Sequence, residues 1–300
     1  MANALKTQNT TDARLDGKLC VITGATSGIG LEAARRIAQG GADLVLVCRN
    51  AEKGEKVAAA IQQDFGVKAN VVLADFSDFE QVRRAADEIL RKYDKLDILI
   101  NNAGVHMTTR AFNKDGLELV FAVNHLAPFL FTRLLFERIK ESAPARILQV
   151  NSEGHRFSRV DLNDLRWEKR IYRGIRSYGQ SKTAQLLTVW EMADELVGSG
   201  VTINAMHPGA VKSNIGMNNG WLYRNYQKYI LFPLLKDVTV SAEAIYYLVA
   251  APEMAETSGK FYNLTIEEVP AKHARDRELG KRVWAVSEAL TGLSGENHAL

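Results

Sequence analysis

The feature that most constrains the fold is a short apolar run followed at once by a glycine-rich turn and an amphipathic stretch. The run covers residues 18–23, the turn reads GATSGIG over residues 24–30, and helical periodicity continues to Gln39. A strand, a glycine turn and a helix in this order form the context that a nucleotide-binding loop requires. The first glycine permits the tight turn, the second lets the backbone approach a pyrophosphate, and the third allows the helix to pack on the strand. The residues predicted to contact the nucleotide here are Gly24, Thr26, Ser27, Gly28, Ile29 and Gly30.

Strand-like and helix-like stretches continue to alternate along the first half of the chain, with three further apolar runs between residues 43 and 100. This alternation is typical of a parallel sheet whose ligands bind at the carboxyl ends of its strands. We therefore predict an α/β protein with a single domain over residues 15–293. It would contain a Rossmann-type doubly wound parallel sheet of about seven strands, helices on both faces and a small helical substrate lid at about residues 213–237. The polar residues 1–14 are predicted to form a disordered tail.

Composition and charge exclude several classes of protein. The 38 Lys and Arg and the 35 Asp and Glu residues nearly cancel to a net +3, and no long basic run occurs, so nucleic acid is not an expected partner. Cys20 and Cys48 lie in apolar runs and are expected to be buried free thiols. The first sixteen residues lack the apolar stretch of a signal peptide, and no run of about 18 apolar residues follows. We expect a soluble, cytoplasmic protein without a transmembrane segment.

The end of the second strand bears on which dinucleotide is bound. It reads Cys48-Arg49-Asn50, without the acidic residue that would bond the ribose hydroxyls of an unphosphorylated cofactor. An Arg at this place can bind a 2′-phosphate through two hydrogen bonds. We therefore predict NADP(H), bound by Arg49 and Asn50, over the alternative that Arg49 is a solvated loop residue.

Two later strand ends carry further candidate cofactor contacts. Asp75 could accept a bond from the adenine amino group or could instead cap the helix that starts near Asp78, and both interpretations stay open. The small residues at 101–104 would let the backbone approach a flat ligand, although an ordinary turn has the same composition. The candidate residues are Asp75, Phe76, Asn102, Ala103 and Gly104.

Residues 117–140 form a long apolar stretch that is predicted to be a helix, buried or facing a partner subunit. Pro128 should kink this helix or mark an irregular turn, and Asn124 needs hydrogen-bond partners in so apolar a setting. A structural cap is the plain interpretation of Asn124. The next strand, residues 146–151, ends at Ser152, which either begins a turn or bonds a substrate oxygen.

Tyr178 and Lys182 open a stretch of helical periodicity that runs to about Val197. Four residues apart on a helix, they would project from the same face. A nearby ammonium favours the phenolate and lowers the pKa of a phenol, which makes the pair a tunable acid and base. Taken alone the pair is a weak signal, because Tyr and Lys occur at this spacing on many surface helices. The other motifs of the sequence are what favour catalysis over that plain interpretation.

Together these motifs resemble the short-chain dehydrogenase/reductase superfamily over residues 15–290. The chain also resembles the retinol dehydrogenase and WW-domain oxidoreductase-like branch. The features of that branch are Cys48-Arg49-Asn50, the extended insert between Asn151 and Tyr178, and the later motifs SGKFY and RVW.

The resemblance implies a catalytic tetrad. Tyr178 would exchange a proton with the substrate oxygen, while Lys182 would depress its pKa and bind the nicotinamide ribose. Ser152 would orient the carbonyl, and Asn124 would hold a proton-relay water, as hydride passes between nicotinamide and substrate. Residues 207–213 resemble the loop beside the nicotinamide carboxamide, which makes further cofactor contacts of Pro208, Gly209, Val211 and Ser213.

Three features depart from the family pattern. Asn151 stands where the family often has Ser, and Pro128 occupies a position that is seldom Pro. The membrane-anchoring N-terminus of several retinol dehydrogenases is not found, which weakens the transfer of a retinoid substrate.

Residues 213–237 are rich in apolar and aromatic side chains and follow the nicotinamide loop, so we predict a lid over a hydrophobic substrate. Core packing, or contact with a membrane or a partner, is the alternative. The expected function is NADP(H)-dependent interconversion of a hydrophobic alcohol and its aldehyde or ketone, by a monomer or a homodimer. One alternative is a non-catalytic NADP(H)-sensing protein, against which the Tyr–Lys pair argues. Another is a sugar-nucleotide epimerase or dehydratase, whose usual GxxGxxG turn is not seen.

Overall fold

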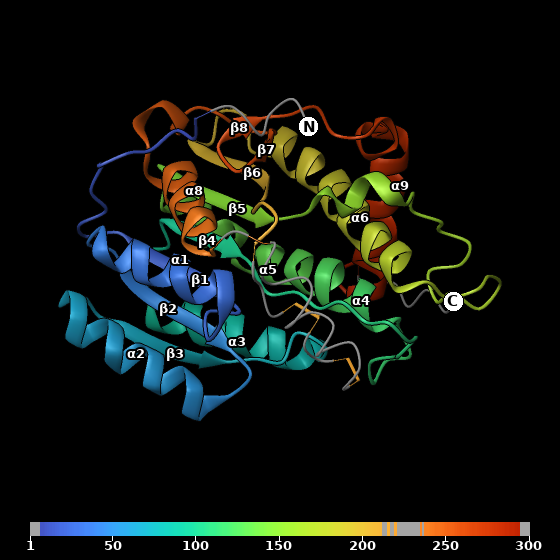
Figure 1. The fold of residues 1–300 in the computed structure, drawn as a ribbon, viewed down its shortest axis with the longest axis horizontal. Helices are drawn as coiled ribbons and strands as arrows, with labels where there is room; N and C mark the ends of the chain where they lie inside the picture. The colour runs from blue at the N-terminus through green and yellow to red at the C-terminus, as the bar shows by residue number, and fades with distance from the viewer. Residues whose placement is uncertain (1–6, 212–214, 217–218, 221–234, 236, 295–300) are drawn as a thin grey trace.

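An eight-stranded sheet crosses the middle of the molecule and defines its layers (Figure 1). The structure, a computed structural model, describes residues 7–211, 215–216, 219–220, 235 and 237–294. The strands are β1 Leu19–Thr23, β2 Asp43–Cys48, β3 Ala69–Leu73, β4 Ile98–Asn101, β5 Ala145–Val150, β6 Val201–His207, β7 Phe261–Asn263 and β8 Ile266–Glu267.

The strand order is β3-β2-β1-β4-β5-β6-β7-β8, and every pair is parallel except β7 with β8. Strands β1 to β3 are added toward one edge of the sheet and β4 to β7 toward the other, so the strand order switches between β1 and β4. A sheet of this kind binds its ligand at that switch point, outside the carboxyl ends of the strands. The predicted α/β doubly wound fold is therefore confirmed.

Helices cover both faces of the sheet. They are α1 Gly28–Gln39, α2 Ala51–Phe65, α3 Phe79–Lys92, α4 Leu119–Phe121, α5 Ala127–Glu141, α6 Gly174–Glu195, α8 Thr239–Ala250 and α9 Arg277–Thr291. Because neighbouring residues of a strand point to opposite faces, Val21 joins the apolar core with α3, α5 and α6, whereas Cys20 and Ile22 join the core with α1, α2 and α8. The sheet thus lies between two apolar layers, with α1 and α8 in front of it in Figure 1 and α3 and α5 behind.

Two details differ from the sequence expectations. The sheet has eight strands rather than about seven, because the two-residue β8 turns back on β7 and is too short to show as an apolar run. The described part of the predicted disordered tail, residues 7–14, has no helix or strand but is bonded to the domain. Asn9 N–H donates to the Thr265 hydroxyl at 2.8 Å, and the Tyr246 hydroxyl donates to the Ala13 carbonyl. Cys20 and Cys48 are free and buried, as predicted.

The apolar stretch predicted as one helix consists of α4, a π-helical turn η2 at Ala122–Leu126, and α5. In η2 the Ala127 N–H donates to the Ala122 carbonyl, five residues back. Pro128 lies at the start of α5, where its missing N–H costs least, so the irregular turn precedes the proline. The stretch Leu119–Glu141 is long and apolar enough to cross a membrane, yet 83% of its most apolar window is buried inside the fold.

Candidate active site

The turn between β1 and α1 has the geometry of a phosphate cradle. Gly24 and Gly28 have φ angles of 69° and 54°, which side chains disfavour. A Cβ on Gly30 would lie 2.3 Å from the Gly24 carbonyl oxygen, so no larger residue fits. Ser27, the N-cap residue of α1, makes no side-chain capping bond, whereas side chains cap α2 and α3. The positive end of α1 is therefore open to an anion. The other predicted contacts of the turn, Thr26 and Ile29, are half-buried.

Thr23 ties the loop after β4 to this turn. Its hydroxyl accepts hydrogen bonds from the N–H groups of Asn102 and Ala103, both at 3.0 Å, and its carbonyl accepts one from the Asn102 amide at 2.9 Å. A Cβ on Gly104 would lie 3.3 Å from Asn124 Oδ1. The predicted contacts at residues 102–104 are therefore held beside the cradle by Thr23, a residue that the sequence analysis did not single out.

The predicted contacts after β2 lie at the carboxyl edge of the sheet. Arg49 is exposed, and no acidic side chain in the described ranges pairs with it. Asn50 Oδ1 accepts from the Lys53 N–H at 2.8 Å and caps α2. The amide of Asn50 thus has a structural task, while Arg49 is free to meet an anion.

The predicted contacts after β3 are mostly structural. Asp75 Oδ1 accepts bonds from the N–H and the hydroxyl of Ser77, at 2.8 and 2.7 Å, whereas Asp78 caps α3. Asp75 therefore does not cap the helix, and it stabilises the turn that precedes it. The Phe76 ring is buried and packs on Phe131, with centroids 5.6 Å apart. The side chain of Phe76 belongs to the core, which leaves only its backbone for a cofactor.

Helix α6 presents Tyr178 and Lys182 one turn apart, as predicted. A Cβ on Gly154 would lie 2.9 Å from the Tyr178 ring and 3.4 Å from Ser152 Oγ, so both side chains flank one backbone position. The Ser152 hydroxyl is also close enough to the phenol to lower the pKa of Tyr178. Lys182 Nζ lies 5.8 Å from the centroid of the Tyr178 ring and donates to the Val150 carbonyl at 2.8 Å. The end of β5 and the first turns of α6 thus assemble Ser152, Tyr178 and Lys182.

Burial governs the protonation of this pair. It raises the pKa of Tyr178 to about 12, against the lowering effect of the Ser152 hydrogen bond. It also lowers the pKa of Lys182 to about 7. The expected lowering of the phenol pKa by Lys182 is not found in this arrangement, because the amine donates to Val150 and Gln185 and burial disfavours its charge. Near neutrality Tyr178 is protonated and Lys182 titrates.

A buried polar network beneath Lys182 centres on Gln185. Gln185 Oε1 accepts from Lys182 Nζ at 3.4 Å and from Asn151 Nδ2 at 2.8 Å. Gln185 Nε2 donates to the Asn124 carbonyl and to Gln149 Oε1, both at 3.2 Å. Leaving such groups unpaired in the interior is costly, so the network fixes α6 against β5 and η2. The sequence analysis missed Gln185, although its place three residues after Lys182 was a signal.

This network explains Asn151, which stands where the family often has Ser. Besides Gln185, Asn151 Nδ2 donates to the Lys182 carbonyl at 3.0 Å, so the longer amide reaches α6. Asn124 is held in a similar way. Its Oδ1 accepts from the Val105 N–H at 2.8 Å, and its Nδ2 donates to the Val105 carbonyl at 3.0 Å and to Ser181 Oγ at 3.1 Å. The structural interpretation accounts for the Asn124 side chain, and its water-holding role stays a prediction.

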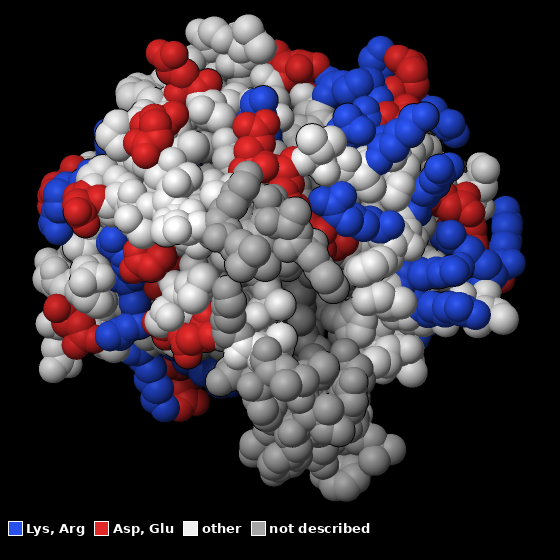
Figure 2. Space-filling view, turned by 45° about the horizontal axis from the view of Figure 1, so that its top comes forward, with Lys and Arg blue, Asp and Glu red and all other residues white. Residues whose placement is uncertain are grey.

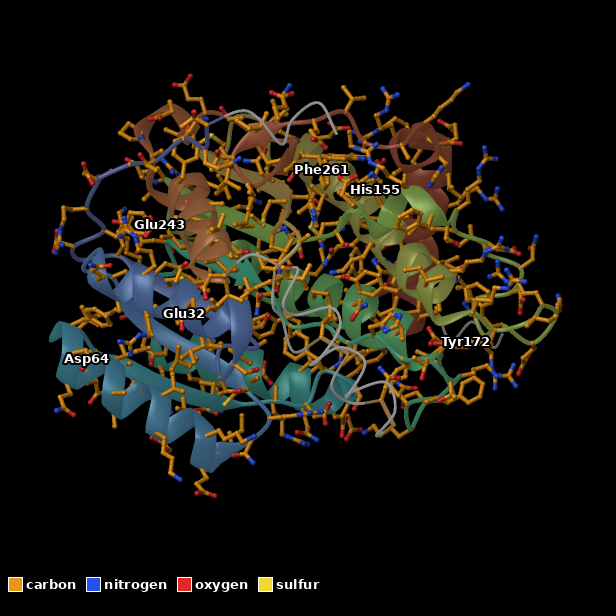
Figure 3. The ribbon with its side chains drawn as sticks, in the orientation of Figure 1. Glu32, Asp64, His155, Tyr172, Glu243 and Phe261 are labelled. Atoms are coloured by element: carbon orange, nitrogen blue, oxygen red, sulfur yellow. The ribbon has the colours of Figure 1, made fainter. Side chains whose placement is uncertain are left out.

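His155 supports Ser152 from behind, in the 3₁₀ segment η3 at Glu153–Phe157. Its Nδ1 donates to the Ser152 carbonyl at 2.8 Å and its Nε2 accepts from the Ala271 N–H at 3.2 Å, an arrangement that defines the neutral tautomer. The buried ring packs on Phe261 of β7 with centroids 5.0 Å apart, and the two lie side by side in Figure 3. The sequence offered no signal for this support, because it joins segments more than a hundred residues apart.

The loop after β6, predicted to lie beside the nicotinamide, is described only in part. The Ser241 hydroxyl of α8 donates to the Pro208 carbonyl, Gly209 has a φ of 83°, and Val211 is buried. Ser213 and most of the predicted lid, residues 213–237, lie outside the described residues.

The described lid residues contact the loop after β4. His106 N–H donates to the Ile215 carbonyl at 3.1 Å, and Thr108 N–H donates to Asn219 Oδ1 at 2.6 Å. The His106 ring lies edge-on to Tyr178, with centroids 5.7 Å apart, and burial lowers its pKa. His106 is therefore a further residue at the site that the sequence analysis missed.

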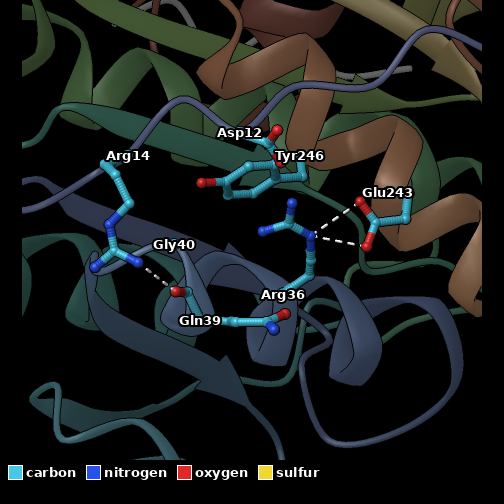
Figure 4. Close-up of a pocket in the computed structure, with 7 residues that line it drawn as sticks. All are labelled: Asp12, Arg14, Arg36, Gln39, Gly40, Glu243 and Tyr246. Atoms are coloured by element: carbon cyan, nitrogen blue, oxygen red, sulfur yellow. Dashed lines mark hydrogen bonds and ion pairs between the residues drawn. The ribbon is translucent and has the colours of Figure 1, made fainter.

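A separate pocket of about 280 Å³ lies between the end of α1 and α8, near the amino end of β2 (Figure 4). Arg36 Nε donates to both carboxylate oxygens of Glu243, and its guanidinium lies 3.5 Å over the Tyr246 ring. Arg14 pairs with Asp16. These charges are satisfied within the protein, at the edge of the sheet away from Ser152. Among the described residues, no group of three His, Cys, Asp or Glu side chains could hold a metal.

Comparisons with known proteins agree with this geometry. Residues 18–163 match the family described as short chain dehydrogenase. Retinol dehydrogenase 13 of Homo sapiens is 37% identical over 286 residues, which cover 94% of this chain and 86% of the relative. Retinol dehydrogenase 12 of Mus musculus is 39% identical over 290 residues, covering 96% and 90%.

Solved structures show the same fold. An uncharacterized protein from Mycobacterium paratuberculosis is similar with a TM-score of 0.74 and 29% identity, over 95% of this chain and 98% of the other. A short-chain dehydrogenase from Shigella flexneri, in complex with NADP, has a TM-score of 0.67 at 21% identity, over 85% and 99%. At that identity the second structure supports the fold alone.

Proposed function

This chain belongs to the short-chain dehydrogenase/reductase family, in its retinol dehydrogenase-like branch, and from that premise we propose an NADP(H)-dependent enzyme that interconverts a hydrophobic alcohol and its aldehyde or ketone. Alcohol and carbonyl oxidoreduction with a nicotinamide cofactor is common to the family. The observation that carries the proposal is the meeting of Ser152, Tyr178 and Lys182 at the edge of the sheet that also holds the glycine cradle.

The site residues divide the work of proton transfer and orientation. A bound nicotinamide dinucleotide supplies or accepts hydride at C4. Tyr178 keeps its proton at neutral pH, because its pKa is about 12, and can donate it to a carbonyl oxygen that becomes negative. The Ser152 hydroxyl, which flanks the same backbone position as the phenol, can bond the same oxygen and orient it. The phenolate left on Tyr178 would favour the charged form of Lys182, so the buried amine gains its proton when it is needed.

The residues of the cradle fit a dinucleotide. The open start of α1 suits the pyrophosphate, and the close approach of Gly30 to Gly24 leaves the turn room for backbone contacts only. We propose NADP(H) rather than NAD(H) because Arg49 is exposed after β2 with no acidic partner in the described part of the chain. Its guanidinium can bind the 2′-phosphate through two parallel bonds.

The hydrophobic substrate is proposed from the aromatic residues at 213–237 and from the similarity to retinol dehydrogenases. A retinoid is one candidate within the broader class of apolar carbonyl compounds. A cytoplasmic location and action as a monomer or homodimer complete the proposal.

The test is turnover by the purified full chain. We expect NADPH consumption with apolar aldehydes or ketones, and a loss of at least about 100-fold in kcat on Tyr178→Phe, which removes the proton donor. The matched control is Tyr93→Phe at the C-cap of α3, which should leave kcat unchanged. A wild-type chain that binds NADPH but turns over no member of a broad carbonyl panel would favour the non-catalytic sensor instead.

Cofactor choice has its own measurement. Arg49→Ala should weaken NADPH binding about 10-fold or more while NADH binding changes little, because only NADPH carries the 2′-phosphate. Equal losses for both cofactors, or none for either, would contradict the role given to Arg49.

A further inference from the structure

The insert between η3 and α6 accounts for the net positive charge of the chain. Residues 156–176 contain seven Lys or Arg and three Asp or Glu, a net +4, whereas the entire chain carries +3, so all other residues together carry −1. Figure 2 shows basic side chains gathered on the side of the molecule where Figure 1 places this insert, with few acidic ones among them.

The insert lines a groove of about 550 Å³ at the surface, which we call the basic groove. Its lining combines four arginines and one acidic residue with aromatic, aliphatic and hydroxyl side chains: Arg159, Arg170, Arg173, Arg176, Asp161, Phe157, Trp167, Ile171 and Ser158.

Three of these arginines are not neutralised within the protein. Arg170 pairs with Asp161 and Asp164. Arg159, Arg173 and Arg176 are exposed, and no acidic residue in the described ranges lies within ion-pair distance of them. Arg173 and Arg176 also stand at the N-cap and in the first turn of α6, which has no acidic residue there. Cations at a helix N-terminus are unfavourable for the helix, so stability of α6 does not explain their presence.

Large apolar side chains are exposed among these charges. Ile171 is 81% exposed and Phe157 63%, and Ile175, in the first turn of α6, is 54% exposed. Exposed apolar groups gathered in one place mark an interaction surface. The combination of arginines with exposed aliphatic and aromatic side chains is the chemistry that binds the interface of an anionic membrane, where phosphates meet the cations and the apolar groups enter the acyl boundary.

We propose that the basic groove docks this protein on the surface of anionic phospholipid membranes. A fluid bilayer suits the insert better than a folded partner does, because residues 158–173 contain no helix or strand that could offer a regular docking face. Membrane docking would also bring the active site to the lipid. Ser158 of the groove packs against Gly179, the residue after Tyr178, since a Cβ on Gly179 would lie 3.1 Å from Ser158 Cβ.

The test is co-sedimentation of the purified full chain with vesicles. We expect binding to vesicles of phosphatidylcholine mixed with phosphatidylglycerol, weak binding to phosphatidylcholine alone, and release by added salt. Arg173→Gln with Arg176→Gln should lower the partition coefficient roughly 30-fold, since each basic side chain near such a surface contributes about a factor of five. Ile171→Ser should also weaken binding, and it does so without a change in charge.

The matched control is Arg84→Gln with Arg91→Gln, the same charge change at two exposed positions of α3. It should bind vesicles as the wild type does, which separates a local site from a general effect of net charge. Thermal unfolding and turnover of a water-soluble carbonyl compound check that each variant is folded. Because the readout is binding, it is independent of whether the proposed catalytic activity is correct.

Three results would overturn the proposal. One is equal binding to neutral and anionic vesicles, and another is an equal loss of binding in the groove and control variants. The third is tight binding of polyglutamate or duplex DNA by a chain that does not sediment with anionic vesicles, which would assign the groove to an acidic macromolecule.

Discussion

Replacing Lys182 by Met should make the cofactor-free protein more stable while it removes the amine to which we assign a catalytic role. Lys182 is 3% exposed and has no acidic partner among its described contacts, which are the Val150 carbonyl and Gln185 Oε1. Burial lowers its pKa from 10.5 to about 7. At about 1.4 kcal/mol for each pKa unit, this corresponds to about 5 kcal/mol of destabilisation at and below neutral pH.

The substitution also removes two donor bonds. The Val150 carbonyl loses its Lys182 partner, at a cost of about 1–3 kcal/mol, whereas Gln185 Oε1 keeps the bond from Asn151. The expected net gain for Lys182→Met is therefore about 2–4 kcal/mol in the free energy of unfolding at pH 7. Denaturant unfolding followed by circular dichroism measures it, and Lys53→Met at an exposed position of α2 should change it by less than about 0.5 kcal/mol.

The pH dependence gives a second, independent check. The folded chain favours the neutral amine and the unfolded chain the charged one, so the penalty is complete below pH 7 and vanishes as the pH rises to 10.5. The stability difference between Lys182→Met and the wild type should shrink over this range. Two results would refute the view that burial disfavours the charge of Lys182. One is a variant that is less stable than the wild type at pH 7, and the other is a stability difference between variant and wild type that stays constant up to pH 10.

Three further predictions concern other parts of the molecule. Gly30→Ala should destabilise the protein by about 1–3 kcal/mol and abolish measurable NADPH binding, because its Cβ would lie 2.3 Å from the Gly24 carbonyl oxygen; an unchanged NADPH titration contradicts the cradle. Gln185→Glu should raise the pKa of Lys182 by placing a carboxylate where Oε1 lies 3.4 Å from Nζ, and so move the pH profile of kcat/KM to higher pH, whereas the exposed Gln63→Glu should not. Burial lowers the pKa of His125 to about 3, so this residue alone should lower the free energy of unfolding by about 1.4 kcal/mol for each pH unit between 6.5 and 3, and His125→Leu should reduce the measured slope by about that amount.

The fold could be predicted from the sequence because its signals are local. The apolar runs that form β1, β2 and β3 and the glycine turn after residue 23 are each contained in a few residues, and the order of strand and helix defines the sheet class. The two-residue β8 was missed because so short a strand carries no periodicity. The π-helical turn was expected only as an irregularity near Pro128, since α-helical and π-helical turns share the same apolar pattern.

The site was predictable where it depends on spacing and unpredictable where it depends on contacts across the fold. Tyr178 and Lys182 could be identified from their separation of four residues on one helix. The roles of His155 and His106 come from partners in distant segments, Ala271 and Ile215 respectively, which no local pattern reveals. The pKa values also follow from burial, so a sequence could suggest that Lys182 acts on Tyr178 but not that desolvation would dominate both groups.

The position of the Asn124 side chain depends on the number of residues in the π-helical turn. One residue more than an α-helical turn is present between Ala122 and Ala127. Since successive residues of an α-helix are rotated by about 100°, a single deletion there would restore regular winding and swing Asn124 away from Val105. In an alignment of homologues, a one-residue gap at this point would therefore mark a relative whose loop after β4 is anchored by different means.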